Sequence, residues 1–334
     1  MTNEETISPK ELEQKVEIYQ EKLQSIRDEV AKIFVGQKHI VTGLIEALLC
    51  NGHVLLEGIP GVGKTLVIRT LAKITGCTFS RIQFTPDLLP TDILGITTYE
   101  EGKGFYTVKG PVFANFVLGD EINRSPPKVQ SALLEAMQER QVTIGKETFV
   151  LSYPFFVMAT QNPLEQLGTY KLPEAQLDRF FFKILMMYPT NEDELNILTK
   201  NMTTSKFEDY NIQPILDLDQ IIEVQELVKK INIDKKMSEY IVRIIDATRF
   251  PEKYDLKLGK YIANGGSPRA SIALFVASKA RALMNNRTQV TPVEVRGVAK
   301  NVLRHRIIIN FEGQAENITT DQIIEEILAK VKIL

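Results

Sequence analysis

A lysine and a threonine stand at the end of a short glycine-rich segment near residue 60. The stretch "GIPGVGKT" fits the pattern G-x-x-x-x-G-K-[ST], with Gly58, Gly63, Lys64 and Thr65 at the fixed positions. Such a loop turns backbone N–H groups inward around a phosphate chain, with the positive end of the next helix behind them. Lys64 would reach the β- and γ-phosphates, and the Thr65 hydroxyl would bind Mg²⁺. The other loop residues that we expect to line the phosphates are Pro60, Gly61, Val62 and Leu66.

Two adjacent acids, Asp120 and Glu121, end the apolar run "NFVLGDE". This is the form of a Walker B segment, in which Asp120 holds Mg²⁺ through water and Glu121 polarises an attacking water as a general base. A phosphate-binding loop alone fits kinases, GTPases and ATPases. The sequence contains no [NT]-K-x-D segment of the kind that reads guanine. The missing segment counts against a GTPase, and the acid pair is the arrangement for hydrolysis. Together they favour hydrolysis of ATP.

Three further polar residues stand where they could serve the same reaction. Asn162 ends the apolar run "FFVMATQNP", and its amide could orient the attacking water. Arg179 follows the short helical pattern "LPEAQLDRF" and could stabilise transition-state charge in a neighbouring subunit, an effect of about 10³- to 10⁵-fold in rate. The alternative for Arg179 is a surface pair with Asp178. Arg269, in "GGSPRASIALF", begins an apolar helix, and the alternative there is an ordinary arginine near a helix cap.

The elements that must hold these residues change character along the chain. Between residues 53 and 188, five short apolar runs alternate with helical patterns, which predicts a parallel sheet with helices on both faces. An amphipathic helix is expected over 10–33. The remainder, 191–334, reads as helices without a buried strand. These helices are expected at about 192–200, 219–231, 236–250, 269–285, 292–305 and 319–332. We therefore predict an α/β domain over 1–189 and an all-helical domain over 190–334.

Two insertions interrupt the α/β alternation. Residues 91–113 and 139–155 each read as a β-hairpin, with apolar residues on both sides of a glycine-containing turn. Between them, Ser125 is expected to cap a helix whose first positions are Pro126 and Pro127.

Composition limits the classes of protein that remain. The chain has 334 residues, 44% of them apolar, and a formal net charge of −2, so the basic excess of a nucleic-acid coat is missing. Cys50 and Cys77 are the only cysteines, and neither they nor the three histidines fall at metal-site spacings. The longest apolar run is shorter than the roughly 18 residues that a membrane span requires. We expect a cytoplasmic, soluble protein.

Taken together, these segments resemble the MoxR family of AAA+ ATPases from "IFVGQ" (33–37) to "LRHRI" (303–307). The densest run of family motifs is "DEINRSPPKVQSALLEAMQERQVTIG", followed by "ATQNP" and "LPEAQLDRF". The resemblance implies an αβα sandwich with a parallel sheet in the order 5-1-4-3-2, the first hairpin inserted in the second helix, and a helical lid. It also implies a ring, usually of six copies, with ATP at the boundaries between subunits.

The resemblance also implies roles for individual residues. Lys64 and Thr65 match Walker A, Asp120 and Glu121 match Walker B, and Asn162 matches sensor 1. Arg179 matches the arginine finger that acts on a neighbouring subunit, and Arg269 matches sensor 2. Val35, Gly36 and Gln37 fall where the family lines the adenine site, whereas Arg124 stays unassigned between an interface role and a structural one.

The expected partners follow from the same family. Its members are chaperone-like and often act with proteins that contain a von Willebrand factor A domain. The two hairpins are our candidates for contacting the client protein. Three alternatives stay open: a DNA motor, which the slightly negative charge disfavours; a magnesium-chelatase-like motor subunit; and a nucleotide-gated scaffold with little turnover.

Overall fold

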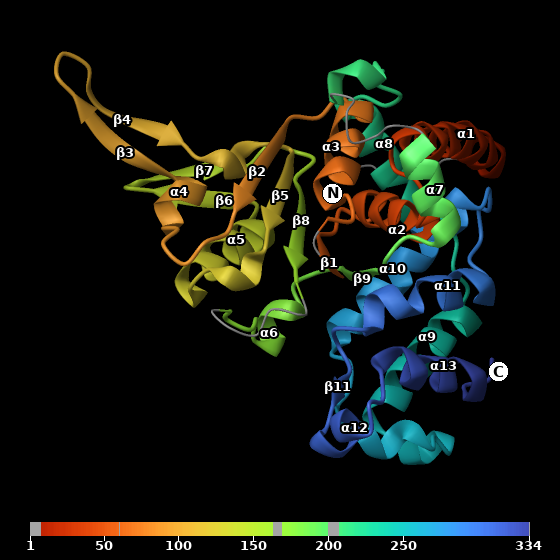
Figure 1. The fold of residues 1–334 in the computed structure, drawn as a ribbon. Coiled ribbons are helices and arrows are strands. Elements are labelled where there is room, and N and C mark those ends of the chain that lie inside the picture. The colour runs from red at the N-terminus through yellow and green to blue at the C-terminus, as the bar shows by residue number, and fades with distance from the viewer. Residues whose placement is uncertain (1–7, 60, 163–168, 200–206, 334) are drawn as a thin grey trace. The chain divides into compact units, whose positions relative to one another are not determined.

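The computed structural model describes residues 8–59, 61–162, 169–199 and 207–333, and within them the chain forms two compact units. The sheet unit comprises Ile26–Leu44 and Asn51–Ile221. The helical unit comprises the described parts of Met1–Ser25, Ile45–Cys50 and Ile222–Leu334. This division by compactness differs from the predicted boundary after residue 189, which stays a proposal for where the lid begins. Figure 1 follows the chain from the N-terminal helix α1 to α13 near the C-terminus.

Five strands of the sheet unit form one parallel sheet. They are β1 (Val54–Gly58), β2 (Phe79–Gln83), β5 (Phe116–Asp120), β8 (Phe156–Gln161) and β9 (Phe182–Met186). Their order across the sheet, β2-β5-β8-β1-β9, is the predicted 5-1-4-3-2 order read from the opposite edge, so the predicted sheet is confirmed. Because the strands are parallel, their carboxyl ends lie along one edge, where open α/β sheets bind ligands.

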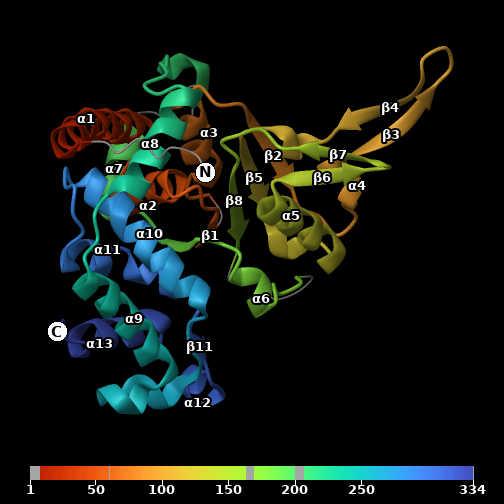
Figure 2. The ribbon, with the colours of Figure 1, turned by 180° about the vertical axis from the view of Figure 1, so that it is seen from behind.

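Helices cover both faces of this sheet, because side chains alternate between the faces of each strand. Val117 and Ala159 belong to a buried apolar cluster that includes Leu133 of α5 (Pro127–Glu139). Their chain neighbours Leu118 and Met158 are fully buried on the other face, where α3 (Lys64–Ile74) packs near β5 and β2. Figure 2 shows α3 and α5 on opposite sides of β5 and β8.

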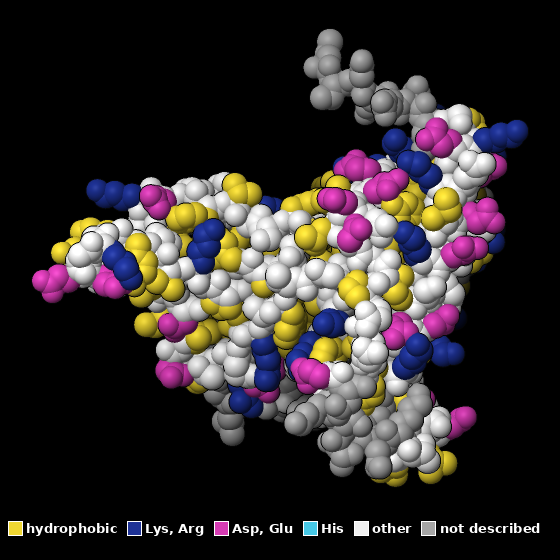
Figure 3. All heavy atoms as spheres, turned by 90° about the horizontal axis from the view of Figure 1, so that it is seen from above, with side chains coloured by type: hydrophobic (Ala, Val, Ile, Leu, Met, Phe, Trp, Pro, Cys, Tyr) yellow, Lys and Arg dark blue, Asp and Glu magenta, His cyan; other side chains and the backbone are white. Residues whose placement is uncertain are grey.

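The two predicted hairpins leave the sheet where the sequence placed them. The first pairs β3 (Gly95–Glu100) with β4 (Gly104–Lys109), between α4 (Pro90–Leu94) and the turn η1 (Pro111–Phe113). The second pairs β6 (Gln141–Ile144) with β7 (Glu147–Val150), between α5 and β8. The first hairpin extends away from the sheet in Figure 1. Figure 3 shows apolar side chains along it and acidic and basic side chains near its end.

These hairpins touch each other near the turn of the second. A Cβ atom added to Gly145, which has a φ of +63°, would lie 2.8 Å from the Thr97 hydroxyl of β3. A side chain at position 145 would therefore be strained and would force Thr97 to shift. The exposed end of the first hairpin carries Tyr99 and Phe105, which are 62% and 79% exposed and have ring centroids 5.2 Å apart.

One predicted cap is wrong. Pro126 is the N-cap of α5, and its ring has no group to accept a hydrogen bond. Ser125 instead ends the turn η2 (Ile122–Arg124), and its hydroxyl donates to the Ile122 carbonyl at 3.3 Å. The proline in the cap position places the serine one residue too early to reach the first helical N–H groups.

Shorter elements complete the sheet unit. They are α6 (Glu174–Leu177), α7 (Asn191–Thr199) and η3 (Phe207–Tyr210). Thr190 caps the start of α7, since its hydroxyl donates to Asp193 at 2.8 Å and accepts from the Asp193 N–H at 3.2 Å.

The helical unit is built mainly from four longer helices that the sequence predicted within about three residues. They are α9 (Lys235–Arg249), α10 (Pro268–Met284), α11 (Pro292–Leu303) and α13 (Thr320–Lys330). Most of α8 (Leu218–Lys230) joins them, with the short helix α12 (Phe311–Ala315) and the turns η4 (Pro251–Tyr254) and η5 (Leu258–Tyr261). The first helices, α1 (Pro9–Ile33) and α2 (Lys38–Leu49), are shared between the units.

No buried strand was expected in this part, and the one small pair found there contains no buried residue. β10 (Ile262–Asn264) and β11 (Ile308–Ile309) pair antiparallel. Both are only partly buried and too short for the apolar run by which a buried strand is recognised. In the described part of the chain, no helix is long and apolar enough to cross a membrane.

Candidate active site

The glycine-rich loop joins the end of β1 to the start of α3. Gly61 and Gly63 have φ values of +82° and +88°, a backbone region that residues with side chains rarely adopt. Gly63 is also the N-cap of α3 and has no side chain to bond the first helical N–H groups. The start of α3 therefore has no side-chain cap, which is typical of helix starts that bind an anion through backbone N–H groups. Lys64 donates to the Gly58 carbonyl at the other end of the loop. Pro60 lies outside the described residues.

The acid pair follows β5 at the carboxyl edge of the sheet. Asp120 is the last residue of β5, and its neighbour on β2 is Gln83. Thr160, on β8, donates its hydroxyl proton to Asp120 Oδ1 at 2.7 Å and accepts from the Glu121 N–H at 2.9 Å. One buried hydroxyl thus fixes both acids, the first through its carboxylate and the second through its backbone.

Glu121 turns out of the strand with φ 58° and ψ 50°, the left-handed region that few non-glycine residues adopt. In a continuing strand, adjacent side chains point to opposite faces. The left-handed residue ends that alternation, so that Glu121, like Asp120, meets side chains of β2. Gln83 donates to Glu121 Oε2 at 2.9 Å, and Arg81 donates to Asp120 Oδ2 at 2.6 Å.

Arg124 also belongs to this group, since its Nε lies 3.3 Å from Glu121 Oε2. The sequence left Arg124 without a role, and the structure gives it a contact with the predicted general base. Asn162 follows the end of β8 and is 5% exposed, so it lies at the same carboxyl edge as the loop and the acid pair.

A hollow of about 400 Å³ opens beside the loop in the sheet unit. Val35 and Gln37, predicted for the adenine, line it together with Gly61, Val62 and Leu66. Its other wall was not predicted from the sequence and includes Phe34, Tyr188, Pro189 and Ile197. This wall is apolar enough to contact a flat base. Tyr188 and Pro189, just after β9, were the residues in the sequence that could have predicted it.

Gly36 lies between those two predicted residues, and its role is to allow a backbone conformation and a close contact that favour glycine. Its φ is +74°, and a Cβ atom there would lie 2.5 Å from the Asp193 carboxyl carbon. Gln37 accepts a hydrogen bond from the Met187 N–H at 3.1 Å. The predicted segment is thereby tied to the segment after β9 that forms the opposite wall.

Arg179 lies away from this edge. It precedes β9, which runs parallel to β1 with Phe182 beside Val54 and Met186 beside Gly58. Arg179 is therefore at the amino edge, and the strand alone separates the two edges by roughly 13 Å. Its side chain is exposed and donates to the Leu134 carbonyl at 3.3 Å. Within one chain, Arg179 does not join the loop and the acid pair.

Arg269 belongs to the helical unit. It is exposed in the first turn of α10, where Ser267 caps the helix by accepting from the Arg269 N–H at 3.2 Å. This is the position that the sequence predicted on its helix.

His53, which the sequence did not single out, joins three elements at the amino edge. Its Nδ1 accepts from the Val157 N–H at 3.0 Å, and its Nε2 lies 3.1 Å from the Met137 carbonyl. Burial, and then the positive charge of Arg140, lower the pKa of His53 to about 3. The ring is therefore neutral, with the proton on Nε2.

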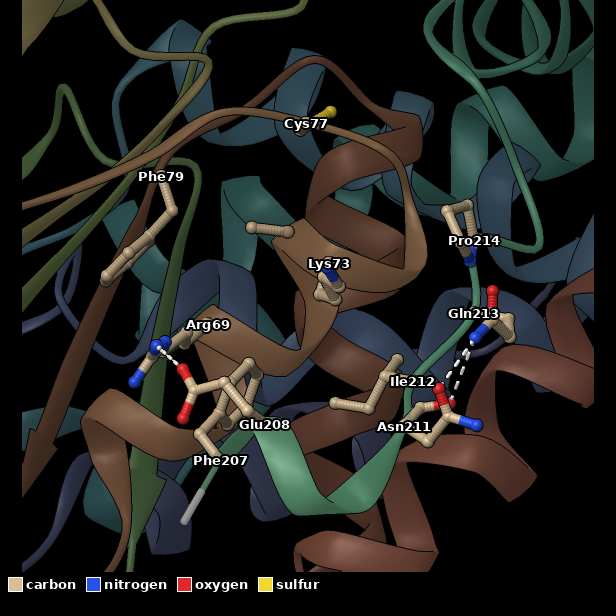
Figure 4. A pocket seen from close by; sticks show the side chains of 11 residues that line it. Arg69, Lys73, Cys77, Phe79, Phe207, Glu208, Asn211, Ile212, Gln213 and Pro214 are labelled. Carbon is tan, nitrogen blue, oxygen red and sulfur yellow. Dashed lines mark hydrogen bonds and ion pairs between the residues drawn. The ribbon is translucent and has the colours of Figure 1, made fainter.

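A second hollow, of about 350 Å³, lies beside α3 in the sheet unit (Figure 4). Arg69 donates to Glu208 at 2.8 Å there, and its guanidinium lies 4.1 Å from the centre of the Phe207 ring. Burial raises the pKa of the nearby Cys77 thiol to about 11, so this cysteine is an unreactive thiol at neutral pH. None of the lining residues belongs to the glycine-rich loop or the acid pair.

The residues at the carboxyl edge fit a magnesium nucleotide. A Cβ atom on Gly61 would meet nothing within 4 Å, so the loop is open on the side where phosphates would bind. No group of three or more His, Cys, Asp or Glu in the described ranges is placed to hold a metal alone. Mg²⁺ would thus be held by Thr65, Asp120 and the phosphates, and when bound it would neutralise phosphate charge.

Comparisons with known proteins agree with this geometry. A family model described as "ATPase family associated with various cellular activities (AAA)" matches residues 53–182, and a model of the AAA lid domain matches residues 259–327. The fold and the site thus define a P-loop ATPase of the AAA+ class followed by a lid.

Individual relatives narrow the class. The chain is 46% identical to Chaperone MoxR1 of Mycobacterium tuberculosis, over 91% of this chain and 80% of that protein. It is 44% identical to the Uncharacterized protein YeaC of Bacillus subtilis, over 92% and 93%. A crystal structure of an inferred ATPase from Cytophaga hutchinsonii is 49% identical, with a TM-score of 0.91 over 97% of this chain and 98% of that one. The chain belongs to the MoxR family of chaperone-like AAA+ ATPases.

Proposed function

We propose that the chain hydrolyses ATP with Mg²⁺ at sites shared between adjacent copies in a ring of six, and that turnover remodels a protein partner. In this proposal Lys64 and the backbone from Gly58 to Leu66 bind the phosphates. Val35, Gly36 and Gln37 border the base. Thr65 and Asp120 hold the metal.

The reaction itself is assigned to four side chains. Glu121 accepts a proton from the attacking water, and Asn162 orients that water. Arg179 reaches the site of the next copy and stabilises the charge that develops on the transferred phosphoryl group. Arg269 carries the nucleotide state to the helical unit.

The observation that carries the proposal is the position of Arg179. It is exposed at the amino edge of the sheet, whereas the glycine-rich loop is at the carboxyl edge. An arginine so placed cannot act on the phosphates of its own chain without disrupting the sheet. A second copy of the chain supplies the complementary half.

Mixing two inactive variants tests this sharing. Glu121→Gln removes the base, and Arg179→Ala removes the arginine, so each alone should lose about 10³-fold in turnover while still binding a fluorescent ATP analogue. In an equal mixture, about one quarter of randomly formed interfaces join an intact acid pair to an intact arginine, and turnover should return to about one quarter of wild type. A mixture no more active than its two components, or a fully active Arg179→Ala, would show that the site is not shared.

The partner is proposed on family resemblance alone. It is a protein client, with a von Willebrand factor A-domain protein as an accessory, and the two hairpins contact the client. If the Glu121→Gln variant retains the client protein in ATP and releases it in ADP, the proposed client interaction is supported. Equal retention in both nucleotides would contradict it.

A further inference from the structure

Two basic side chains of α3 line the second hollow (Figure 4). Arg69 and Lys73 are four residues apart on this helix, so they lie on one face with Cβ atoms about 6 Å apart. Like charges at this spacing destabilise a helix unless something neutralises them. Glu208 neutralises one of them, because it accepts a hydrogen bond from Arg69 at 2.8 Å. Lys73 is exposed and pairs with none of the acidic side chains that the structure describes.

The end of α3 does not require the Lys73 charge. A lysine in the last turn of a helix commonly serves the final carbonyl groups, which lack partners within the helix. In α3, backbone N–H groups beyond the helix already donate to these four carbonyls. The carbonyls belong to Leu71, Ala72, Lys73 and Ile74. The backbone therefore fills the usual structural task of such a lysine, and the charge can serve a ligand.

The opposite wall of the hollow comes from residues 207–214, and it is fixed at both ends. At one end, the Arg69 guanidinium lies 4.1 Å from the centre of the Phe207 ring. Just beyond the other end, the Ile215 N–H donates to the Ile74 carbonyl at 2.7 Å. Ile212, between the two ends, is buried. The hollow is thus formed before a ligand arrives, which lowers the cost of binding.

The rest of the lining sets the size and the charge of a ligand. A volume of about 350 Å³ is at the lower end for small-molecule sites. Phe79, Ile212 and Pro214 give the hollow apolar surface. The two basic side chains and the Glu208 carboxylate together leave one positive charge. This charge matches a monoanion better than a dianionic phosphate, which Glu208 would repel more strongly.

We propose that the second hollow binds a small organic acid, whose carboxylate lies between Arg69 and Lys73 and whose apolar body fills the rest of the space. Bound there, the acid bridges α3 to the wall 207–214. The side chains of Arg69 and Glu208 are 44% and 69% exposed, and an ion pair this exposed is weak enough for the acid to compete with. The inference concerns a site outside the nucleotide edge and does not depend on ATP hydrolysis.

The test titrates the full-length chain with phenylacetate and, separately, with its neutral amide, phenylacetamide, by ligand-observed NMR. A saturating, non-hydrolysable ATP analogue with Mg²⁺ keeps both probes out of the glycine-rich loop. The acid should bind about three- to ten-fold more tightly than the amide, the range expected for two partly exposed charge pairs. Equal binding of the two probes, or no binding of the acid, overturns the proposal.

A pair of lysine variants tests the positive charge. Lys73→Met keeps the aliphatic stem and removes the charge, so it should weaken binding of the acid about two- to five-fold and leave binding of the amide unchanged. Lys128→Met removes an exposed lysine of α5, which does not line the hollow, and should leave both affinities unchanged. An equal loss in the two variants would indicate a general effect of charge and overturn the site.

Glu208→Gln tests the competition with the resident carboxylate. This variant frees the Arg69 guanidinium, so the acid should bind about two- to five-fold more tightly than to wild type. A purely structural role for the pair between Arg69 and Glu208 would not produce such a gain. An affinity that is unchanged or weaker contradicts the proposed position of the carboxylate.

Hydrogen-exchange mass spectrometry locates the bound acid. Phenylacetate should slow exchange in peptides that cover 207–217, because the acid bridges this segment to α3, and should leave the β3–β4 hairpin unchanged. Binding without protection of 207–217 refutes the inference. If the chain binds no nucleotide, the proposed function fails, and the same titrations without the analogue still decide whether the hollow binds the acid.

Discussion

Replacement of His53 by glutamine should change how the stability of the sheet unit depends on pH. His53 is 5% exposed and accepts from the Val157 N–H, and this arrangement requires the neutral ring. Burial and the charge of Arg140 lower its pKa to about 3 in the folded chain. Glutamine can occupy the same space with one donor and one acceptor, but it does not titrate.

The direction of the pH effect follows from comparing the protonation of His53 in the folded and the unfolded chain. Well above the ordinary histidine pKa of about 6.5, His53 is neutral whether the chain is folded or not, so it contributes nothing to the pH dependence. Below that value the unfolded chain binds a proton that the folded chain does not bind until about pH 3. The folded state therefore loses stability as the pH falls from 6.5 toward 3, by about 1.4 kcal/mol for each pH unit once the unfolded histidine is charged.

Between pH 7 and pH 5 this amounts to about 2 kcal/mol in wild type and to nothing from residue 53 in His53→Gln. Carboxylates that titrate in the same range contribute equally to both proteins and cancel in the difference. The sequence has no tryptophan. Urea unfolding is therefore followed by hydrogen-exchange mass spectrometry of peptides from β1 and β8. Parallel stability curves for wild type and His53→Gln from pH 7 to pH 5 would refute a neutral, buried His53.

Two further substitutions probe the nucleotide edge. Thr160→Val keeps the shape but removes the hydroxyl that joins Asp120 to Glu121, so urea unfolding should show a loss of about 1–3 kcal/mol and phosphate release should slow, whereas Thr160→Ser should retain both properties. Gly63→Ala adds a methyl group at φ +88° and 3.2 Å from the Phe34 ring, at a cost of about 1–2 kcal/mol in strain, and should weaken binding of a fluorescent ATP analogue. Gly102 has a similar φ of +89° in open space at the hairpin turn, so Gly102→Ala is the matched control. An equal loss of nucleotide binding in Gly102→Ala would contradict a local role for Gly63.

Much of the fold could be predicted because its signals are local. Each buried strand is a short apolar run next to a motif, and helices such as α10 and α13 begin at recognisable caps, Ser267 and Thr319. The division into units depends on distant contacts instead. Tyr19 of α1 donates to Glu223 of α8 at 2.5 Å, and an amphipathic pattern in α1 does not reveal which surface it will cover.

The same contrast holds for the candidate site. Lys64 and Asp120 stand in motifs with fixed spacing, so their sequence neighbours identify them. Arg81, Gln83 and Thr160 are polar residues on strands and belong to no motif. Their importance appears only when the sheet order puts β2 and β8 on either side of β5. The alternation in "FSRIQF" was the available signal, because it sets Arg81 and Gln83 on one face.

The contact between Gly145 and Thr97 constrains how the two hairpins can be exchanged with those of relatives. A hairpin graft that brings any side chain to position 145 collides with the threonine of the resident partner, and a bulkier residue at 97 collides with the resident glycine turn. Chimeras that transfer both hairpins together preserve this fit. Under the proposal that the two hairpins contact the client, the pair is the smallest module to exchange between family members.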